Sequence, residues 1–289
     1  MKYKLVHKTT YTYGHLIHNY QCIVCLHPIS SERQNCEDFK LAIDPNPQNL
    51  HARKDYFNNT QYYFSILRPH KILQVTATSI VEVFAPKIIV ANAITCSEAL
   101  QLFTTKLVLK NELLQFQLPS PFIFWNEEIK AFAQTCLIPD ASLYESVAKL
   151  SEKIFTEFEF SSGATTINTP LSDVLKLRKG VCQDFTHLMI ASLRSLGFAA
   201  RYVSGYIETL PPKGKAKLQG SDASHAWVSV YVPEMGWCEF DPTNNIISGE
   251  RHIVTAYGRD YSDISPLKGI IFSSGEHKVK VEVDVIPIK

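Results

Sequence analysis

Residues 179–197, KGVCQDFTHLMIASLRSLG, decide the fold. The apolar run predicts a helix from Val181 to Leu196, because Gly180 allows a sharp turn into it and Gly197 ends it. So many of its side chains are apolar that the helix is expected to be buried rather than to face solvent. It is therefore the central helix of a domain core, and Cys182 stands in its first turn.

Helices are expected before this segment and strands after it. The apolar side chains of residues 142–155 recur at helical spacing, and Asn126 is a suitable N-cap for an earlier helix. The expected helices are 126–135, 142–155 and 169–180, and the expected strands are 200–206, 226–232, 237–240 and 278–285. This order predicts an α+β fold in which a central helix packs against an antiparallel sheet.

The first 90 residues have a different pattern. Short runs rich in Val, Ile, Thr and Tyr are separated by clusters of Asn, Pro and Asp, which predicts an antiparallel, sandwich-like β domain. The expected strands include 3–13, 66–73 and 73–83. We therefore predict an N-terminal β domain over 1–90, a core of helices and strands over 91–262 and a C-terminal strand segment over 263–289.

Composition limits the class of partner. The 289 residues carry 29 Lys and Arg against 28 Asp and Glu, so no global field favours nucleic acid or an anionic membrane. No stretch approaches the roughly 18 to 20 apolar residues needed to cross a bilayer, and the N-terminus lacks the pattern of a signal peptide. We expect a soluble, mature protein with neither nucleic-acid nor membrane partners.

Seven cysteines are too few and too scattered for a disulfide scaffold, and their odd number fits a reducing cytoplasm. Cys22 and Cys25 form a C-x-x-C pair, but a structural zinc site needs a second ligand pair, which the sequence lacks. We interpret both as small core residues. No cofactor and no metal are expected.

Cys182 is the cysteine whose position favours reactivity, because it stands at the start of the central helix. Unpaired backbone amides at a helix start favour a thiolate over a thiol, and they can also donate to the oxyanion of a tetrahedral intermediate. A free cysteine taken alone is more often a small buried residue. The interpretation of Cys182 as a nucleophile therefore depends on partners elsewhere in the chain.

Two such partners follow on neighbouring strands. His225 stands at the start of one expected strand, and Asp241 ends the next, so a hairpin would bring the carboxylate beside the imidazole. Each also has an ordinary interpretation, His225 as one of ten histidines and Asp241-Pro242 as the start of a turn. Their joint occurrence in the order Cys, His, Asp favours a triad. Cys238, which heads no helix, is interpreted as structural.

Three motifs carry a family resemblance: GVCQDF at 180–185, SHAWV at 224–228 and FDPTN at 240–244. With them the chain resembles the transglutaminase-like superfamily of papain-like thiol enzymes over about residues 140–245. Two outer motifs, DYFNN at 55–59 and HIVTAYGRDYSD at 252–263, are similar to bacterial members that carry an N-terminal β domain and are described as candidate cysteine proteases. Here Asn58 replaces a glycine of the family pattern, which asparagine tolerates because it also enters left-handed conformations.

The resemblance implies a papain-like core with Cys182 as nucleophile, His225 as general base and acid, and Asp241 as the residue that orients the histidine. It implies thiol-dependent hydrolysis of peptide or amide bonds in a peptide or protein substrate, through a thioester. Transfer of the acyl group to an amine, as in a transglutaminase, remains an alternative, and so does a catalytically silent peptide-binding module. A metal hydrolase is a third alternative, for which the sequence offers no H-E-x-x-H motif. The oligomeric state stays open.

Overall fold

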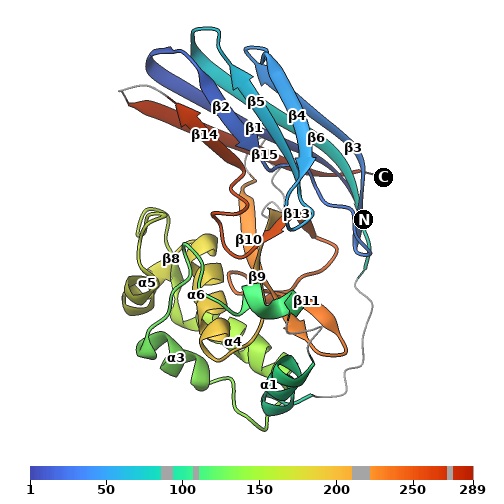
Figure 1. Cartoon of the computed structure of the whole chain (residues 1–289), viewed down its shortest axis with the longest axis vertical. Helices are drawn as coiled ribbons and strands as arrows, with labels where there is room; N and C mark the ends of the chain where they lie inside the picture. Colours follow the sequence, from blue (N-terminus) through green and yellow to red (C-terminus); the bar gives the residue numbers. More distant parts are fainter. Residues whose placement is uncertain (86–93, 107–110, 210–221, 272–275, 289) are drawn as a thin grey trace, which may run out of the picture.

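The computed structural model describes residues 1–288 except for 86–93, 107–110, 210–221 and 272–275. Two antiparallel β-sheets form one end of the molecule, the helices form the other end, and a five-stranded sheet lies between them (Figure 1). The predicted α+β class, with antiparallel sheets, is confirmed.

The sheets at the N-terminal end pack face to face. The first has the order β15-β1-β6-β3, with β15 at His277–Ile288, β1 at Lys2–Ile17, β6 at His70–Val83 and β3 at Gln34–Asp44. The second has the order β14-β2-β5-β4, with β14 at Leu267–Ile271, β2 at Tyr20–Val24, β5 at Thr60–Ile66 and β4 at Asn49–Lys54. Val75 of the first sheet and Phe64 of the second are fully buried in one hydrophobic cluster. Alternate residues of β6 are buried, as a strand with one packed face requires.

Two predicted elements have different boundaries in the structure. The strand expected over 66–73 is wrong, because β5 ends at Ile66 and β6 begins at His70, and Pro69 in the connection has no N–H to donate to a ladder. The helix expected over 169–180 ends at Leu177, because Arg178 adopts a left-handed φ of 52° as its C-cap. Lys179 and Gly180 instead form the short strand β8 (Lys179–Gly180), which pairs with β7 (Glu159–Phe160).

The C-terminal segment returns to the N-terminal sheets. β15 pairs with β1 along its length, and β14 pairs with β2. The domain boundaries remain a prediction, but the structure shows that residues 267–271 and 277–288 share their sheets with strands from residues 2–83. Alternation in a sequence identifies a strand without identifying its partner, which is why the pairing was not foreseen.

The core has its helices on one side and its sheet on the other. The described helical elements are α1 (Cys96–Thr105), η1 (Leu114–Phe116), α3 (Glu127–Gln134), α4 (Leu143–Glu157), α5 (Leu171–Leu177) and α6 (Cys182–Ser195). The sheet has the order β12-β11-β10-β9-β13, with β12 at Ile246–Ile247, β11 at Gly236–Asp241, β10 at Ser224–Val232, β9 at Ala200–Ile207 and β13 at His252–Gly258. Every residue of α6 from Asp184 to Arg194 is buried, and the helix packs on β9 and β10. The central helix against an antiparallel sheet is therefore confirmed.

Two amide side chains from the N-terminal region bind the outer edge of β13. Gln34 accepts from the backbone N–H of Val254 and donates to its carbonyl, at 2.8 and 2.7 Å. Asn59 makes the same pair of bonds to Tyr257, at 2.9 and 2.7 Å. Both side chains are buried, so they satisfy backbone groups that an edge strand would leave open. The N-terminal region thereby fixes the strand that begins at His252.

Candidate active site

The turn that carries Cys182 is held by Asp184 at the third position of α6. The Oδ2 atom of Asp184 accepts from the backbone N–H of Val181 at 2.8 Å and from the hydroxyl of Thr165 at 2.6 Å. A Cβ atom on Gly180 would come within 2.8 Å of the same oxygen, so the turn requires glycine. Sequence reasoning missed Asp184, although an acidic residue at the third position of a helix is a recognised capping signal.

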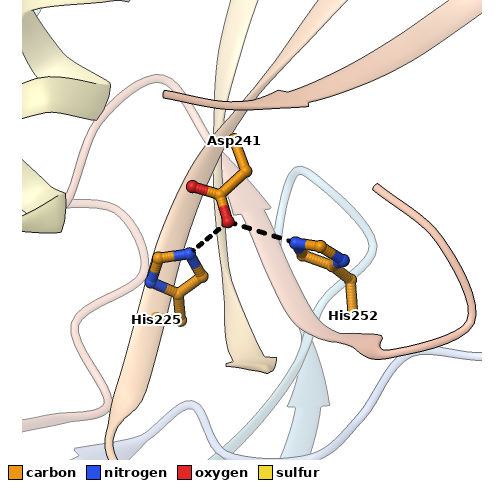
Figure 2. Close-up of side chains that lie close together, drawn as sticks. All are labelled: His225, Asp241 and His252. Carbon is orange, nitrogen blue, oxygen red and sulfur yellow. Dashed lines mark hydrogen bonds and ion pairs between the residues drawn. The ribbon is translucent and has the colours of Figure 1, made fainter. Parts of the chain in front are cut away.

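His225 and Asp241 meet as the hairpin of β10 and β11 predicts. The Nε2 atom of His225 lies 2.7 Å from Oδ2 of Asp241, and both side chains are buried (Figure 2). Asn244 also donates to Oδ2, at 2.7 Å, while the backbone N–H groups of Thr243 and Asn244 bind Oδ1 at 3.0 and 3.2 Å. Asp241 is 0% exposed, so its orientation is fixed by these donors rather than by water.

A second histidine reaches the same carboxylate oxygen. The Nε2 atom of His252, the first residue of β13, lies 3.2 Å from Oδ2 of Asp241 on the side opposite His225 (Figure 2). Its Nδ1 atom accepts from the backbone N–H of Gly249 at 3.3 Å. His252 begins the motif at 252–263, but the sequence assigned it no role in the site, because it lies on a strand that joins the sheet beyond β9 and no local pattern links it to Asp241.

The attraction between opposite charges determines the pKa values of His225 and Asp241. Burial lowers the pKa of His225, but the hydrogen bonds and charges of Asp241 and Cys182 outweigh it and raise the pKa to about 10. Burial raises the pKa of Asp241, but hydrogen bonds from His225, His252 and Asn244 and the charge of His225 lower it well below its ordinary value. The arrangement therefore favours an imidazolium beside a carboxylate at neutral pH.

Cys182 is half-buried at the start of α6, and it lies close enough to His225 to help raise the pKa of that histidine. Because Nε2 of His225 is bonded to Asp241, the nitrogen left for the thiol is Nδ1. The structure thus brings Cys182, His225 and Asp241 together in the predicted order.

Other cysteines lie in less reactive surroundings. All seven are free thiols in the structure. Burial raises the pKa of Cys22, Cys36 and Cys238 to about 11, and that of Cys25 to about 12. A thiol reagent at neutral pH should therefore discriminate strongly against these four.

The Asp241 cluster also has the composition of a metal site. One ligand atom each from His225, Asp241 and His252 lies within 4.8 Å of the others, and two imidazoles with a carboxylate suit a transition metal. The same atoms make hydrogen bonds of 2.7 and 3.2 Å, which require protons on nitrogen in place of a metal. The absence of a metal stays a prediction, and the hydrogen-bonded arrangement accounts for all the distances.

Arg259, Asp260 and Tyr261 of the motif at 252–263 could either line the site or lock the C-terminal segment through an ion pair. Arg259 makes a two-pronged ion pair with Asp263, with both N–O distances at 2.9 Å. Asp260 is buried and accepts from the backbone N–H of Phe122 at 2.9 Å, and the backbone N–H of Tyr261 donates to His187 of α6 at 3.2 Å. These contacts favour the structural interpretation.

No helix in the described part of the chain is long and apolar enough to cross a membrane.

Comparison with known proteins identifies two family regions. Residues 3–82 match the bacterial transglutaminase-like N-terminal region, and residues 130–242 match the transglutaminase-like superfamily. An uncharacterized protein of Mycobacterium tuberculosis (strain ATCC 25618 / H37Rv) is 38% identical over 298 residues, which cover 100% of this chain and 93% of that protein.

Two further proteins are similar to this chain, one in structure over the whole chain and one in sequence over a short segment. The crystal structure of a candidate cysteine protease from Cytophaga hutchinsonii superimposes with a TM-score of 0.76 at 21% identity, covering 100% of this chain and 92% of that one. The protein-glutamine gamma-glutamyltransferase of Pseudomonas aeruginosa is 36% identical over 87 residues, which are 30% of this chain and 13% of that protein. The first likeness shows the fold, and the second is confined to a short segment.

Proposed function

Because this chain belongs to the transglutaminase-like superfamily, with the N-terminal region of its bacterial members, we propose that it hydrolyses peptide or amide bonds through the thiol of Cys182. The observation that carries the proposal is the buried 2.7 Å bond between His225 and Asp241, beside a thiol whose nearness also raises the pKa of His225. A thiol at a helix start beside an imidazolium has the surroundings of an activated nucleophile.

The proposed reaction begins with attack of the Cys182 sulfur on the amide carbonyl carbon. A carbon–sulfur bond forms, and the carbonyl electron pair moves to oxygen, where the first backbone amides of α6 can donate to it. As the intermediate collapses, the carbon–nitrogen bond breaks and the leaving amine takes the proton from Nδ1 of His225. The product is a thioester and a neutral imidazole.

Water completes the cycle. The neutral imidazole of His225 removes a proton from water as the oxygen attacks the thioester, and the carbon–sulfur bond breaks to release the carboxylic acid and the thiolate. Throughout, the Nε2–H group of His225 stays bonded to Asp241, which fixes the ring and stabilises the imidazolium each time it forms. The substrate is accordingly expected to be a peptide or protein.

Transfer to an amine is the second candidate. The local similarity to a protein-glutamine gamma-glutamyltransferase favours it, because the first half of the reaction is common to both activities. The acyl acceptor alone separates them. In a third possibility, the cleft grips a peptide without chemistry; the polar connection from Cys182 to Asp241 argues against it.

The test compares Cys182→Ala with Cys238→Ala, which removes a thiol with a raised pKa that packs against the same hydrophobic cluster. Wild type and Cys238→Ala should react with iodoacetamide at Cys182 at neutral pH, before the other thiols. A peptide library analysed by mass spectrometry, with and without added amine, should show cleavage that is lost in Cys182→Ala. Labelling of Cys182 no faster than of Cys238 would contradict an activated nucleophile, and amine adducts in place of cleavage would establish the transferase alternative.

We also propose a cytoplasmic location and no nucleic-acid or membrane partner, on the basis of the near-zero net charge and of seven free cysteines. Fractionation of the native organism followed by detection of the protein would test the location.

A further inference from the structure

We propose that His252 is a positioning residue of this site, which holds Asp241 against His225 through a hydrogen bond that does not depend on the state of His225. The inference rests on the proposed function, since it concerns the residue that orients the catalytic histidine. His252 contributes from the edge strand β13, while His225 and Asp241 belong to the central hairpin of the sheet.

The hydrogen bonds of the His252 ring assign its proton. The backbone N–H of Gly249 donates to Nδ1, so Nδ1 is an acceptor and carries no proton. The ring proton is therefore on Nε2, which points at Oδ2 of Asp241 from 3.2 Å (Figure 2). The backbone N–H of His252 also donates to the carbonyl of Gly249 at 3.0 Å, so one short turn fixes both the strand start and the tautomer.

The ring is also fixed by packing. His252 is 2% exposed, and its ring meets the indole of Trp227 edge to face, with centroids 5.1 Å apart and an interplanar angle of 72°. The indole is itself held by a 2.9 Å hydrogen bond from its Nε1 atom to Glu239. The strand that carries His252 is fixed as well, because the Gln34 side chain makes two hydrogen bonds to the backbone of Val254, two residues beyond His252. His252 thus presents its Nε2–H group to Asp241 from a rigid frame.

The donors to Oδ2 of Asp241 other than His225, which are His252 and Asn244, matter because His225 changes charge during the proposed cycle. When the imidazolium of His225 gives its Nδ1 proton to the leaving amine, Asp241 loses the attraction of a full positive charge in a buried site. The bond from His252 is unaffected by that step, so it keeps Oδ2 where the next imidazolium needs it. A purely structural histidine would fill the same space without influencing the thiol.

Two substitutions separate these roles. His252→Phe keeps a ring against Trp227 but removes the donor, whereas His252→Gln offers a side-chain N–H that can reach Asp241. We expect His252→Phe to slow the alkylation of Cys182 by iodoacetamide at pH 7 about tenfold, the effect of losing one hydrogen bond to a charged group. His252→Gln should restore most of the rate.

The matched control is His7→Phe, which removes another buried imidazole. His7 is bonded to Tyr206 at 2.8 Å and to Thr9 at 3.1 Å, in contact with neither Asp241 nor His225. His7→Phe should lower the melting temperature without changing the alkylation rate of Cys182. Proton NMR adds a direct measurement, because the proton between His225 and Asp241 should give a downfield resonance that broadens in His252→Phe, persists in His252→Gln and is absent in Asp241→Asn.

The outcomes distinguish this inference from the proposed function. If Cys182 in the wild type reacts no faster than Cys238, the proposed function fails. If Cys182 is fast in the wild type and equally fast in His252→Phe, or if His252→Gln is as slow as His252→Phe, positioning by His252 fails and the function stands. Stoichiometric binding of Zn²⁺ that is lost in His252→Gln, together with activity that EDTA abolishes, would overturn positioning in favour of a metal centre.

Discussion

Two buried carboxylates on β11 receive a hydrogen bond from β10 in the same geometry, and only one of them is bonded to the histidine beside Cys182, the proposed nucleophile. Trp227 donates to Glu239 at 2.9 Å, and His225 bonds Asp241 at 2.7 Å. The two donors are two residues apart on one strand, and the two acceptors are two residues apart on the other, so all four side chains lie on the same face of the hairpin. The sheet therefore repeats one arrangement twice.

The difference lies in what the donor can do. The indole of Trp227 has one N–H group and no second nitrogen, so it cannot pass a proton from Glu239 to another group. The other partners of Glu239 are the hydroxyl of Tyr257, which donates at 3.0 Å, and the guanidinium of Arg33 at 3.8 Å. His225 has a second nitrogen, Nδ1, which is not bonded to Asp241, and Cys182 lies close enough to help raise the pKa of the ring. Burial of a carboxylate in a hydrogen-bonded hairpin is thus a structural device, and it gains a chemical role only where the donor can pass a proton onward.

The largest effect should come from Asp241→Asn. The amide is close in shape but loses the charge that raises the pKa of His225, so turnover of the best library peptide should fall on the order of 10²- to 10⁴-fold. The measurement is kcat/KM for that peptide, with circular dichroism to establish folding. A folded Asp241→Asn variant with full activity would rule out the orienting role.

Glu239→Gln is the same change made in the other pair, and it should affect stability instead. Trp227, Tyr257 and Arg33 lose a charged acceptor, so the free energy of unfolding should fall by about 1–3 kcal/mol. Denaturant unfolding measures this loss, and the iodoacetamide rate of Cys182 should stay at the wild-type value. Slower alkylation of Cys182 in this variant would show that the Trp227–Glu239 pair influences the His225–Asp241 pair.

The pairs should also differ in their response to pH. The folded-state pKa of His225 is about 10, above its ordinary value of 6.5, so the stability that it contributes is fully present below pH 6.5 and is lost as pH rises through about 10. The difference in unfolding free energy between wild type and Asp241→Asn should therefore shrink over this range. Glu239→Gln, titrated in parallel by denaturant unfolding, should keep a constant difference from wild type between pH 6.5 and 9, since His225 remains paired in it.

The smallest effect is expected from Asn244→Ala. It removes one of the donors to Oδ2 of Asp241, at 2.7 Å, and leaves both histidines in place. Loss of about 1 kcal/mol predicts a decrease of about fivefold in kcat/KM. Thr243→Ala is the control, because Thr243 reaches Asp241 through its backbone N–H, which the substitution keeps. Equal losses in both variants would assign the effect to the turn rather than to the amide.

Much of the core could be predicted from the sequence. The expected helix over 181–196 agrees with α6 at Cys182–Ser195, and the expected strands over 200–206 and 226–232 lie within β9 and β10. The turn motif at 55–59 also behaves as expected, since Asn58 adopts a left-handed φ of 66°. These features depend on neighbours in the chain, whose periodicity, caps and glycines are visible in any short window.

Other features depend on residues far apart in the chain. Nothing near His252 indicates that its ring meets Asp241, and nothing near Gln34 indicates that its amide binds Val254, 220 residues away. The two carboxylates make the limit plain, because Glu239 and Asp241 both end up buried and bonded although local pattern distinguishes only the Asp-Pro turn.

The sequence by itself determined the α+β class, the central helix and the three residues proposed for catalysis, because each is signalled by local periodicity or by a short motif. Tertiary structure decided that the C-terminal strands join the N-terminal sheets, that Asp184 holds the turn at Cys182, and that a second histidine reaches Asp241. The physical reason is that strand pairing and buried hydrogen bonds are chosen by packing the whole chain, where each polar group must find a partner in space and not in sequence.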